Sequence, residues 1–184
     1  VYIFNWSTLR DYFIKSEDSN KCFDDFGKNI IPMMLEDQAE MYAYSFKGYW
    51  RDVGTIESLW EANMDLINDP EAVDLNDPQW RIYTNTNDVP PQYIGPNASV
   101  KKSLIADGCR VYGIVKNTVL SHKVQIGEGS VVEDSVIMPN VKIGKNVVIK
   151  KAMIAEGAVI EDNAIIKDED DEISVVSEFE LVKA

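Results

Sequence analysis

The sequence predicts two regions of different architecture, an α/β segment followed by a parallel β-helix. Strand and helix signals alternate over residues 1–67, and from Tyr93 onward branched aliphatic residues recur about every six residues. Residues 68–92 lie between them and carry turn signals such as Asn68-Asp69-Pro70 and Val89-Pro90-Pro91. We therefore expect the C-terminal piece of an α/β domain over 1–67, a linker over 68–92, and a β-helix domain with a C-terminal strand over 93–184.

The composition is that of an ordinary globular protein. Of the 184 residues, 45% are hydrophobic and 27% are charged. The formal net charge of -13 argues against nonspecific binding to nucleic acid or to an anionic membrane, which needs a basic surface. Cys22 and Cys109 lie far apart without metal-ligand spacing, so we expect two reduced thiols. With no apolar run of membrane-spanning length and no signal peptide, a cytoplasmic location is expected.

The first region reads as strands and helices in turn. The apolar run Val1–Phe4 predicts a strand already under way at the start of the chain, which indicates that an upstream part is missing. Ser7 or Thr8 is expected to cap a helix through Ile14, and Ile30–Leu35 is expected to form a second helix. Met41–Phe46 alternates apolar and polar residues, as a half-buried strand does.

A third helix is predicted directly after Thr55, its expected N-cap. The apolar residues of this helix fall on one face: Ile56, Leu59, Trp60, Met64 and Ile67. Asp52 therefore is expected at a strand-to-helix junction, where α/β folds commonly place groups that bind substrate or metal. In the linker, Trp80–Tyr83 predicts a short strand.

The aliphatic repeat has a second, longer period. Ile126-Gly127-Glu128-Gly129-Ser130-Val131 and Ile143-Gly144-Lys145-Asn146-Val147-Val148 are aligned copies 17 residues apart. Three units of about six residues make one 17-residue coil of triangular section, in which each aliphatic points inward and stacks on its counterpart about 4.8 Å away. An antiparallel β domain would instead show period two and hairpin turns. The predicted inward residues are Ile94, Val100, Ile105, Val111, Ile126, Val132, Ile137, Ile143, Ile149, Ile154, Ile160 and Ile166.

The repeat is interrupted at two places, and each interruption predicts a local irregularity in the β-helix. The phase breaks between Asn117 and Gln125, where we expect a loop or a distorted corner. The acidic run Asp168–Glu172 is expected to end the ladder with charge, and Ile173–Val176 to add a last strand that covers the coil end.

A few polar and aromatic residues could carry chemistry, and each has a structural alternative. Asp52 could hold Mg²⁺, which prefers a small number of carboxylates plus water and substrate oxygens. Asp25 could hydrogen-bond sugar hydroxyls or merely cap a helix, and Tyr2 and Trp50 could line a ligand or belong to the core. His122, the only histidine, could be the general base of an acyltransferase or an exposed loop residue.

The segments Gly48–Ile56 and Asp25–Pro32, together with the repeat, resemble sugar-1-phosphate nucleotidyltransferases. The closest resemblance is to bacterial glucose-1-phosphate adenylyltransferase (ADP-glucose pyrophosphorylase). It also covers the Val1–Phe4 strand, Trp80–Tyr83 in the linker and Gly108-Cys109 in the coil. It implies that residues 1–67 end a Rossmann-like nucleotidyltransferase domain and that the β-helix of hexapeptide repeats is left-handed.

The resemblance also implies an activity and a set of site residues. The parent enzyme, the longer protein of which this chain would be a part, joins ATP and glucose 1-phosphate into ADP-glucose and pyrophosphate for glycogen synthesis. Asp52 would be catalytic and hold Mg²⁺, and Tyr2, Asp25, Phe26 and Trp50 would bind glucose 1-phosphate. The parent would be an allosteric homo-oligomer, a tetramer. The ATP-binding loop would lie upstream of Val1, so apart from the Mg²⁺ ligand Asp52 no cofactor-binding residue falls in this chain, and we expect it to be inactive alone.

Three other functions remain open from the sequence. A pyrophosphorylase for another sugar or nucleotide would share these residues, because the choice of base is made upstream. A non-catalytic regulatory subunit of the same enzyme could lose Asp25 and Asp52, and both are present. A hexapeptide acyltransferase would leave residues 1–67 without a role.

Overall fold

The computed structural model describes residues 1–18, 25–75, 77–84 and 88–184, so Cys22 lies outside the described residues. The chain divides into two compact units, Val1–Lys47 and Gly48–Ala184. The helices are α1 (Trp6–Asp18), η1 (Phe26–Ile30, a π-helix), α2 (Ile31–Glu36) and α3 (Ile56–Asn68). The strands are β1 (Tyr93–Ile94), β2 (Ser99–Lys101), β3 (Leu104–Ile105), β4 (Arg110–Val111), β5 (Ile114–Lys116), β6 (Val119–Leu120), β7 (Gln125–Ile126), β8 (Val131–Glu133), β9 (Val136–Ile137), β10 (Lys142–Ile143), β11 (Val148–Lys150), β12 (Ala152–Ile154), β13 (Val159–Ile160), β14 (Ile165–Ile166), β15 (Ser174–Val176) and β16 (Leu181–Val182).

The N-terminal unit consists of helices around a small core of Leu9, Ile30 and Met34. The predicted helix over Ile30–Leu35 is confirmed as η1 and α2. Helix α1 begins earlier than predicted, because the Asn5 side chain accepts a 3.1 Å hydrogen bond from the amide of Ser7.

The two strands predicted in this unit are absent. Val1–Phe4 and Met41–Phe46 are extended segments without strand pairing. A strand exists only as a member of a hydrogen-bonded ladder, and the described residues of this unit provide no neighbouring strand. Met41–Phe46, predicted as a half-buried strand, is exposed along its whole length and unpaired, so this prediction was wrong.

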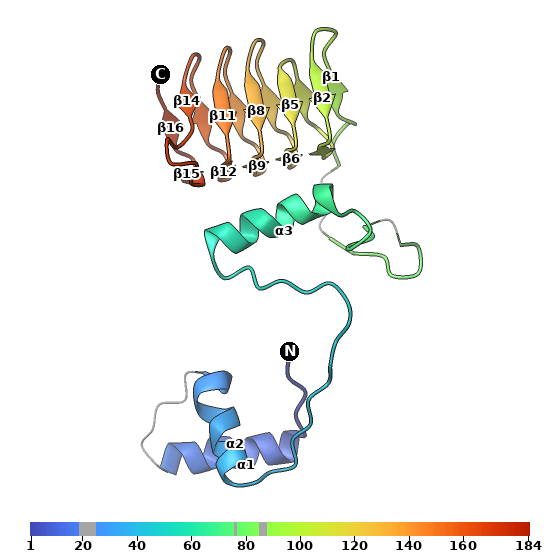
Figure 1. Cartoon of the computed structure of the whole chain (residues 1–184), viewed down its shortest axis with the longest axis vertical. Helices are drawn as coiled ribbons and strands as arrows, with labels where there is room; N and C mark the ends of the chain where they lie inside the picture. The colour runs from blue at the N-terminus through green and yellow to red at the C-terminus, as the bar shows by residue number, and fades with distance from the viewer. Residues whose placement is uncertain (19–24, 76, 85–87) are drawn as a thin grey trace. The chain divides into compact units, whose positions relative to one another are not determined.

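The repeat region folds as a parallel β-helix with three sheets (Figure 1). Sheet A has the order β1-β4-β7-β10-β13-β16, sheet B the order β14-β11-β8-β5-β2, and sheet C the order β15-β12-β9-β6-β3. Every pairing is parallel, and Ile126, Ile143 and Ile160 stand in register in sheet A. The predicted 17-residue coil is confirmed at these positions.

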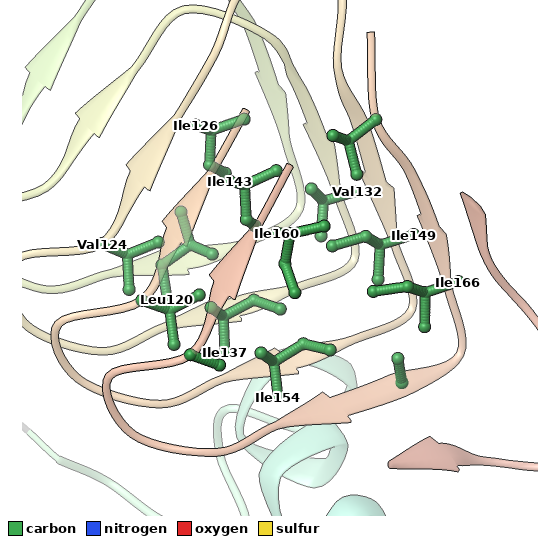
Figure 2. Packing of buried hydrophobic residues seen from close by; sticks show 14 of the residues in the cluster. Leu120, Val124, Ile126, Val132, Ile137, Ile143, Ile149, Ile154, Ile160 and Ile166 are labelled. Atoms are coloured by element: carbon green, nitrogen blue, oxygen red, sulfur yellow. The ribbon is translucent and has the colours of Figure 1, made fainter. Parts of the chain in front are cut away.

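The core of the β-helix is a set of stacked aliphatic side chains (Figure 2). Ile137 and Ile154 form one ladder in sheet C and Val132 and Ile149 another in sheet B, all with no exposed surface. Ile143 is 4% exposed, as the repeat predicted. Further buried rows of smaller residues, such as Val124, Val141 and Ala158, fill the rest of this core.

The irregular corner lies elsewhere than predicted. Between Asn117 and Gln125 the ladder continues through β6 and β7. The short corner is instead Tyr112-Gly113, because Val111 pairs with Ile126 whereas Ile114 pairs with Val131, so that two residues replace four. A Cβ at Gly113 would lie 2.3 Å from the carbonyl oxygen of Ser130, so only glycine fits this tight corner.

The acidic run Asp168–Glu172 does not end the ladder. It lies in a loop between β14 and β15, after which β15 pairs with β12 and β16 pairs with β13. The predicted last strand at Ile173–Val176 is confirmed as β15, and one further strand follows it. The charged run is therefore an insertion in the final coil, where exposed loop backbone can accommodate extra residues.

Helix α3 covers the outer face of sheet C. Its residues Leu59, Trp60, Met64 and Ile67 pack on Val136 and Met153 of that sheet. Thr55 caps the helix as predicted, since its Oγ1 accepts a 3.1 Å hydrogen bond from the amide of Ser58. Ile56, predicted on the packed face, is 52% exposed because it lies at the first position of the helix, beyond the sheet contact.

The linker has no regular structure in its described part. Trp80–Tyr83 is not a strand, and Trp80 is 81% exposed. The prediction failed because no neighbouring strand lies alongside this segment in the described part of the linker. None of the helices in the described residues has the length and apolarity that a bilayer crossing requires.

Candidate functional site

Asp25 is held at the start of η1 by main-chain hydrogen bonds. Its Oδ1 accepts from the amides of Gly27, at 2.7 Å, and Lys28, at 2.9 Å. The structural alternative for Asp25, a helix cap, is thus correct. One carboxylate oxygen serves the cap, so the other oxygen is available to a ligand.

Tyr2 and Phe26 lie beside this carboxylate. Their ring centroids are 6.3 Å apart, and the Phe26 ring also stacks on Phe4 with centroids 5.5 Å apart. A Cβ at Gly27 would lie 3.2 Å from Asp25 Oδ1 and 3.7 Å from the Tyr2 hydroxyl, so the two polar groups face the same small space. The absence of a side chain at Gly27 keeps that space open.

This cluster has the chemistry of a carbohydrate site. A phenol can donate and accept hydrogen bonds, a carboxylate accepts them, and aromatic faces suit the apolar faces of a sugar ring. Tyr2 is 57% exposed and Phe26 39% exposed, so both rings are accessible. An open cavity of about 630 Å³ in the same unit is lined by Tyr2 and Phe4, but Asp25 and Phe26 lie outside it.

Trp50 and Asp52 lie on the extended segment that leads into α3. No strand precedes them, so the predicted strand-to-helix junction is instead a coil-to-helix junction. Both side chains are exposed, Trp50 by 67%. Among the described residues, the Asp52 carboxylate has no hydrogen-bond or ion-pair partner, which leaves its oxygens free for a ligand.

Sequence reasoning missed a polar cluster around this segment. Arg51 forms ion pairs with Glu61 and, at 2.7 Å, with Asp65, both on α3. The hydroxyl of Tyr49 donates to the same Asp65 oxygen at 2.9 Å. Partial burial raises the pKa of the Tyr49 phenol, and its hydrogen bond to Asp65 raises it further. The i, i+4 spacing of Glu61 and Asp65 was the available signal, because such residues share a helix face.

The five predicted site residues form two groups, one in each compact unit: Tyr2, Asp25 and Phe26 in Val1–Lys47, and Trp50 and Asp52 in Gly48–Ala184. Among the described residues, no three His, Cys, Asp or Glu side chains gather as a complete metal site. Asp52 fits Mg²⁺ as a single ligand, because this ion keeps several waters and substrate oxygens beside one or two carboxylates.

His122 lies in the turn between β6 and β7 and is half-buried rather than exposed as predicted. Its Nδ1 is buried without a hydrogen-bond partner among the described residues. The main chain explains the burial, since the His122 carbonyl accepts a 3.0 Å bond from Asn140 and fixes the turn against the next coil.

Comparisons with known proteins agree with this architecture. Residues 1–69 match the family model described as nucleotidyl transferase, and residues 92–181 match the model described as GlmU-like, C-terminal hexapeptide. The chain therefore joins part of a nucleotidyl transferase domain to a hexapeptide β-helix, which confirms the predicted fold class. These matches end close to the predicted domain limits, whereas the compact units divide between Lys47 and Gly48.

The resemblance to glucose-1-phosphate adenylyltransferase is confirmed over the whole chain. The protein of that name from Clostridioides difficile (strain 630) is 63% identical over all 184 residues, which are 48% of its length. Those of Desulforamulus reducens and Acetivibrio thermocellus are 57% and 51% identical over 145 residues, 79% of this chain and 36% and 34% of theirs. The chain thus spans about half or less of the length of these relatives.

Proposed function

We propose that the chain is part of an enzyme that makes ADP-glucose and pyrophosphate from ATP and glucose 1-phosphate, for glycogen synthesis. The observation that carries this proposal is the 63% identity, over every residue of the chain, to a protein named glucose-1-phosphate adenylyltransferase. The presence of both Asp25 and Asp52 favours a catalytic over a purely regulatory subunit. A cytoplasmic location and allosteric control belong to the same proposal.

The sugar phosphate would be bound by Tyr2, Asp25, Phe26 and Trp50. Asp25 accepts hydrogen bonds from sugar hydroxyls with the oxygen that does not cap η1, and the Tyr2 hydroxyl adds a second polar contact. Phe26 and Trp50 offer exposed aromatic faces. These residues bind and orient the nucleophile, and holding reactants in place is a large part of catalysis in such a transfer.

Asp52 would be the catalytic carboxylate and a ligand of Mg²⁺. When bound, the ion supplies charge neutralisation on the phosphate oxygens. The carboxylate is suited to this role because it is exposed and has no partner among the described residues. No glycine-rich phosphate loop occurs in the 184 residues, so ATP would be bound by other parts of the parent enzyme and the chain alone is expected to be inactive.

A homo-oligomer, a tetramer in the parent, is also proposed, with the outer face of sheet B in contact with a second copy. That face carries a row of Ile114, Val131, Val148 and Ile165 in register, and Ile165 is 65% exposed. The other two faces differ, since α3 covers sheet C and sheet A presents Arg110, Gln125 and Lys142 at its middle. A flat aliphatic row suits the self-complementary contact of a two-fold axis.

The proposed activity is tested on the full-length parent. Purified enzyme is given glucose 1-phosphate with ATP, GTP, UTP or dTTP, and pyrophosphate release and thermal stabilisation are measured for each. We expect turnover and stabilisation with ATP above the other three nucleotides. A preference for another nucleotide would identify a different pyrophosphorylase, and absence of turnover with all four would point to a regulatory subunit.

A further inference from the structure

The segment that carries Asp52 is attached to α3 on both sides. Before it, Arg51 pairs with Glu61 and Asp65 of the helix. After it, the amide of Thr55 donates a 3.1 Å hydrogen bond to the Ser58 hydroxyl, which completes a reciprocal capping box. Only three residues, 52–54, separate the two attachments. The backbone of Asp52 is therefore restrained at both ends while its carboxylate remains without a partner.

The Arg51 attachment is a forked contact rather than a single surface ion pair. One guanidinium nitrogen pairs with Glu61 and the other lies 2.7 Å from Asp65 Oδ2. That oxygen also accepts the 2.9 Å bond from the Tyr49 hydroxyl, so residues 49 and 51 meet at one point. The planar guanidinium presents a separate nitrogen to each of two carboxylates one helical turn apart, a fixed geometry that the single nitrogen of a lysine does not reproduce.

The helix that receives these contacts is itself fixed. Met64, one position before Asp65, is 3% exposed and packs on Val136 and Met153 of the β-helix. Trp60, one position before Glu61, donates its indole N–H to the carbonyl of Asp134 at 2.9 Å. Successive helix residues point about 100° apart, so one side of α3 meets the β-helix and the adjacent side meets Arg51. Asp52 is thus connected to the β-helix in two steps. The ion pairs of Arg51 attach its segment to α3, and the side chains of Met64 and Trp60 attach α3 to the β-helix.

We propose that Arg51 is a positioning residue, which through Glu61 and Asp65 holds the backbone of Asp52 on α3 and so places its carboxylate for a divalent cation. The part that concerns the cation rests on the proposed function. Tyr49, Arg51, Glu61 and Asp65 then form a clamp. Through this clamp, α3 and the β-helix on which it packs restrain the catalytic carboxylate. A clamp that served stability alone would leave the order of Asp52 and the metal requirement unchanged.

The positioning is measured first on the 184-residue chain, without any enzymatic assay. Backbone ¹⁵N relaxation is recorded for Asp52 and Val53 in the unaltered chain, in Arg51→Met and in Asp65→Asn. Arg10→Met is the matched control, because Arg10 also pairs with a carboxylate, that of Asp11, but on α1 of the other unit. We expect the order parameter at Asp52 to fall from about 0.85 to below about 0.6 in both clamp variants and to stay unchanged in the control.

Amide exchange in α3 distinguishes loss of position from loss of the helix. If the α3 amides keep their protection while Asp52 becomes mobile, the clamp acts on the segment, as proposed. An order parameter at Asp52 that stays near its original value in Arg51→Met would overturn the proposal. So would loss of protection throughout α3, because Arg51 would then stabilise the helix rather than place Asp52.

The consequence for the metal is measured on the full-length parent. Arg51→Met is expected to raise the Mg²⁺ concentration for half-maximal rate about tenfold, with Arg51→Lys between it and the unaltered enzyme. The double variant Arg51→Met with Asp65→Asn is expected to be no worse than Arg51→Met alone, since both changes break the same contact, the ion pair between Arg51 and Asp65. Additive effects or an unchanged Mg²⁺ requirement would contradict the positioning role. Failure of the proposed function would appear separately, as an Asp52→Asn enzyme that keeps its turnover.

Discussion

The indole N–H of Trp60 donates a 2.9 Å hydrogen bond to the main-chain carbonyl of Asp134, 74 residues further along the chain. This bond joins α3 to the corner between β8 and β9, where the Asp134 carboxylate also accepts a 2.7 Å bond from Asn117. The helix therefore is structurally part of the β-helix unit, although the family matches assign it to the nucleotidyl transferase portion. The helix that directly follows the Asp52 segment is therefore held by the β-helix domain.

The docking of α3 predicts a specific loss of stability. Met64→Ala removes the most buried side chain of the helix from its contact with Val136 and Met153. We expect a loss of about 2–5 kcal/mol in the free energy of unfolding, measured by urea denaturation, with faster amide exchange in α3. Ile56→Ala is the control on the same helix, because Ile56 is 52% exposed, and it should change stability by less than about 0.5 kcal/mol. Equal effects of the two changes would contradict the packing described for α3.

The β-helix core gives a sharper contrast between neighbours. Ile143→Asp places a charge among stacked aliphatics that offer it no partner, and the expected cost is several kcal/mol, enough to unfold a thin solenoid. Lys142→Asp, one residue earlier on the same strand, changes an exposed side chain and should leave the fold intact. Far-UV circular dichroism and urea titration of both variants check this. A folded Ile143→Asp variant with normal stability would refute the inward assignment of the repeat.

The sequence predicted best what depends on local periodicity. Ile126, Ile143 and Ile160 recur every 17 residues, so their common inward row could be predicted without any long-range information. The corner at Tyr112-Gly113 was misplaced because a two-residue deletion shifts the repeat, and only the pairing of Ile114 with Val131 shows where the shift occurs. Thr55 was identified correctly as a cap because capping involves residues three apart.

Features that need a partner were predicted poorly or missed. Val1–Phe4 and Met41–Phe46 have the composition of strands, but pairing depends on a neighbour that the described residues do not supply. The apolar face of α3 was predicted, whereas its partner, the outer face of sheet C, was not. The ion pair between Arg51 and Asp65 was missed for the same reason. Arg51 reaches Asp65 only because the segment before Thr55 folds back alongside α3, which the sequence does not indicate. The placement of Gly27 in η1, close to both Asp25 and the Tyr2 hydroxyl, likewise follows from the fold.

The aliphatic row on sheet B predicts self-association of the chain. Val148→Lys adds a charge at the centre of the row and should shift sedimentation of the chain at high concentration toward the monomer. Val159→Lys on sheet A is the matched control, because both valines are 38% exposed, and its sedimentation should equal that of the unaltered chain. If the unaltered chain is a strict monomer at high concentration, or if both variants dissociate it equally, sheet B is not the contact.

Cys109 should react slowly with thiol reagents in the folded protein. Its side chain is 1% exposed, its Sγ lies 3.0 Å from the carbonyl of Ser121, and burial raises the pKa of its thiol. Less thiolate therefore forms at pH 8 than for a free cysteine, and the reagent has little access. In a Cys22→Ser chain, which leaves Cys109 as its only thiol, we expect labelling at least tenfold slower than in urea, followed by absorbance of the released thiolate. Equal rates in the two conditions would show that the site is open.

Asp52→Asn in the full-length parent tests the proposed role of the Asp52 carboxylate, which has no partner among the described residues. The amide keeps the size of the side chain and part of its hydrogen bonding but removes the charge that would hold Mg²⁺. Loss of such an electrostatic group commonly lowers the rate about a hundredfold or more, so the change should appear in kcat and in the Mg²⁺ requirement. Because Asp52 is exposed and supports no contact among the described residues, the melting temperature should change little. Asp107→Asn, an exposed aspartate on the β-helix, is the control and should retain full turnover. Near-normal turnover of Asp52→Asn across a Mg²⁺ titration would show that Asp52 is not a metal ligand, and the segment before Thr55 would then be a structural turn.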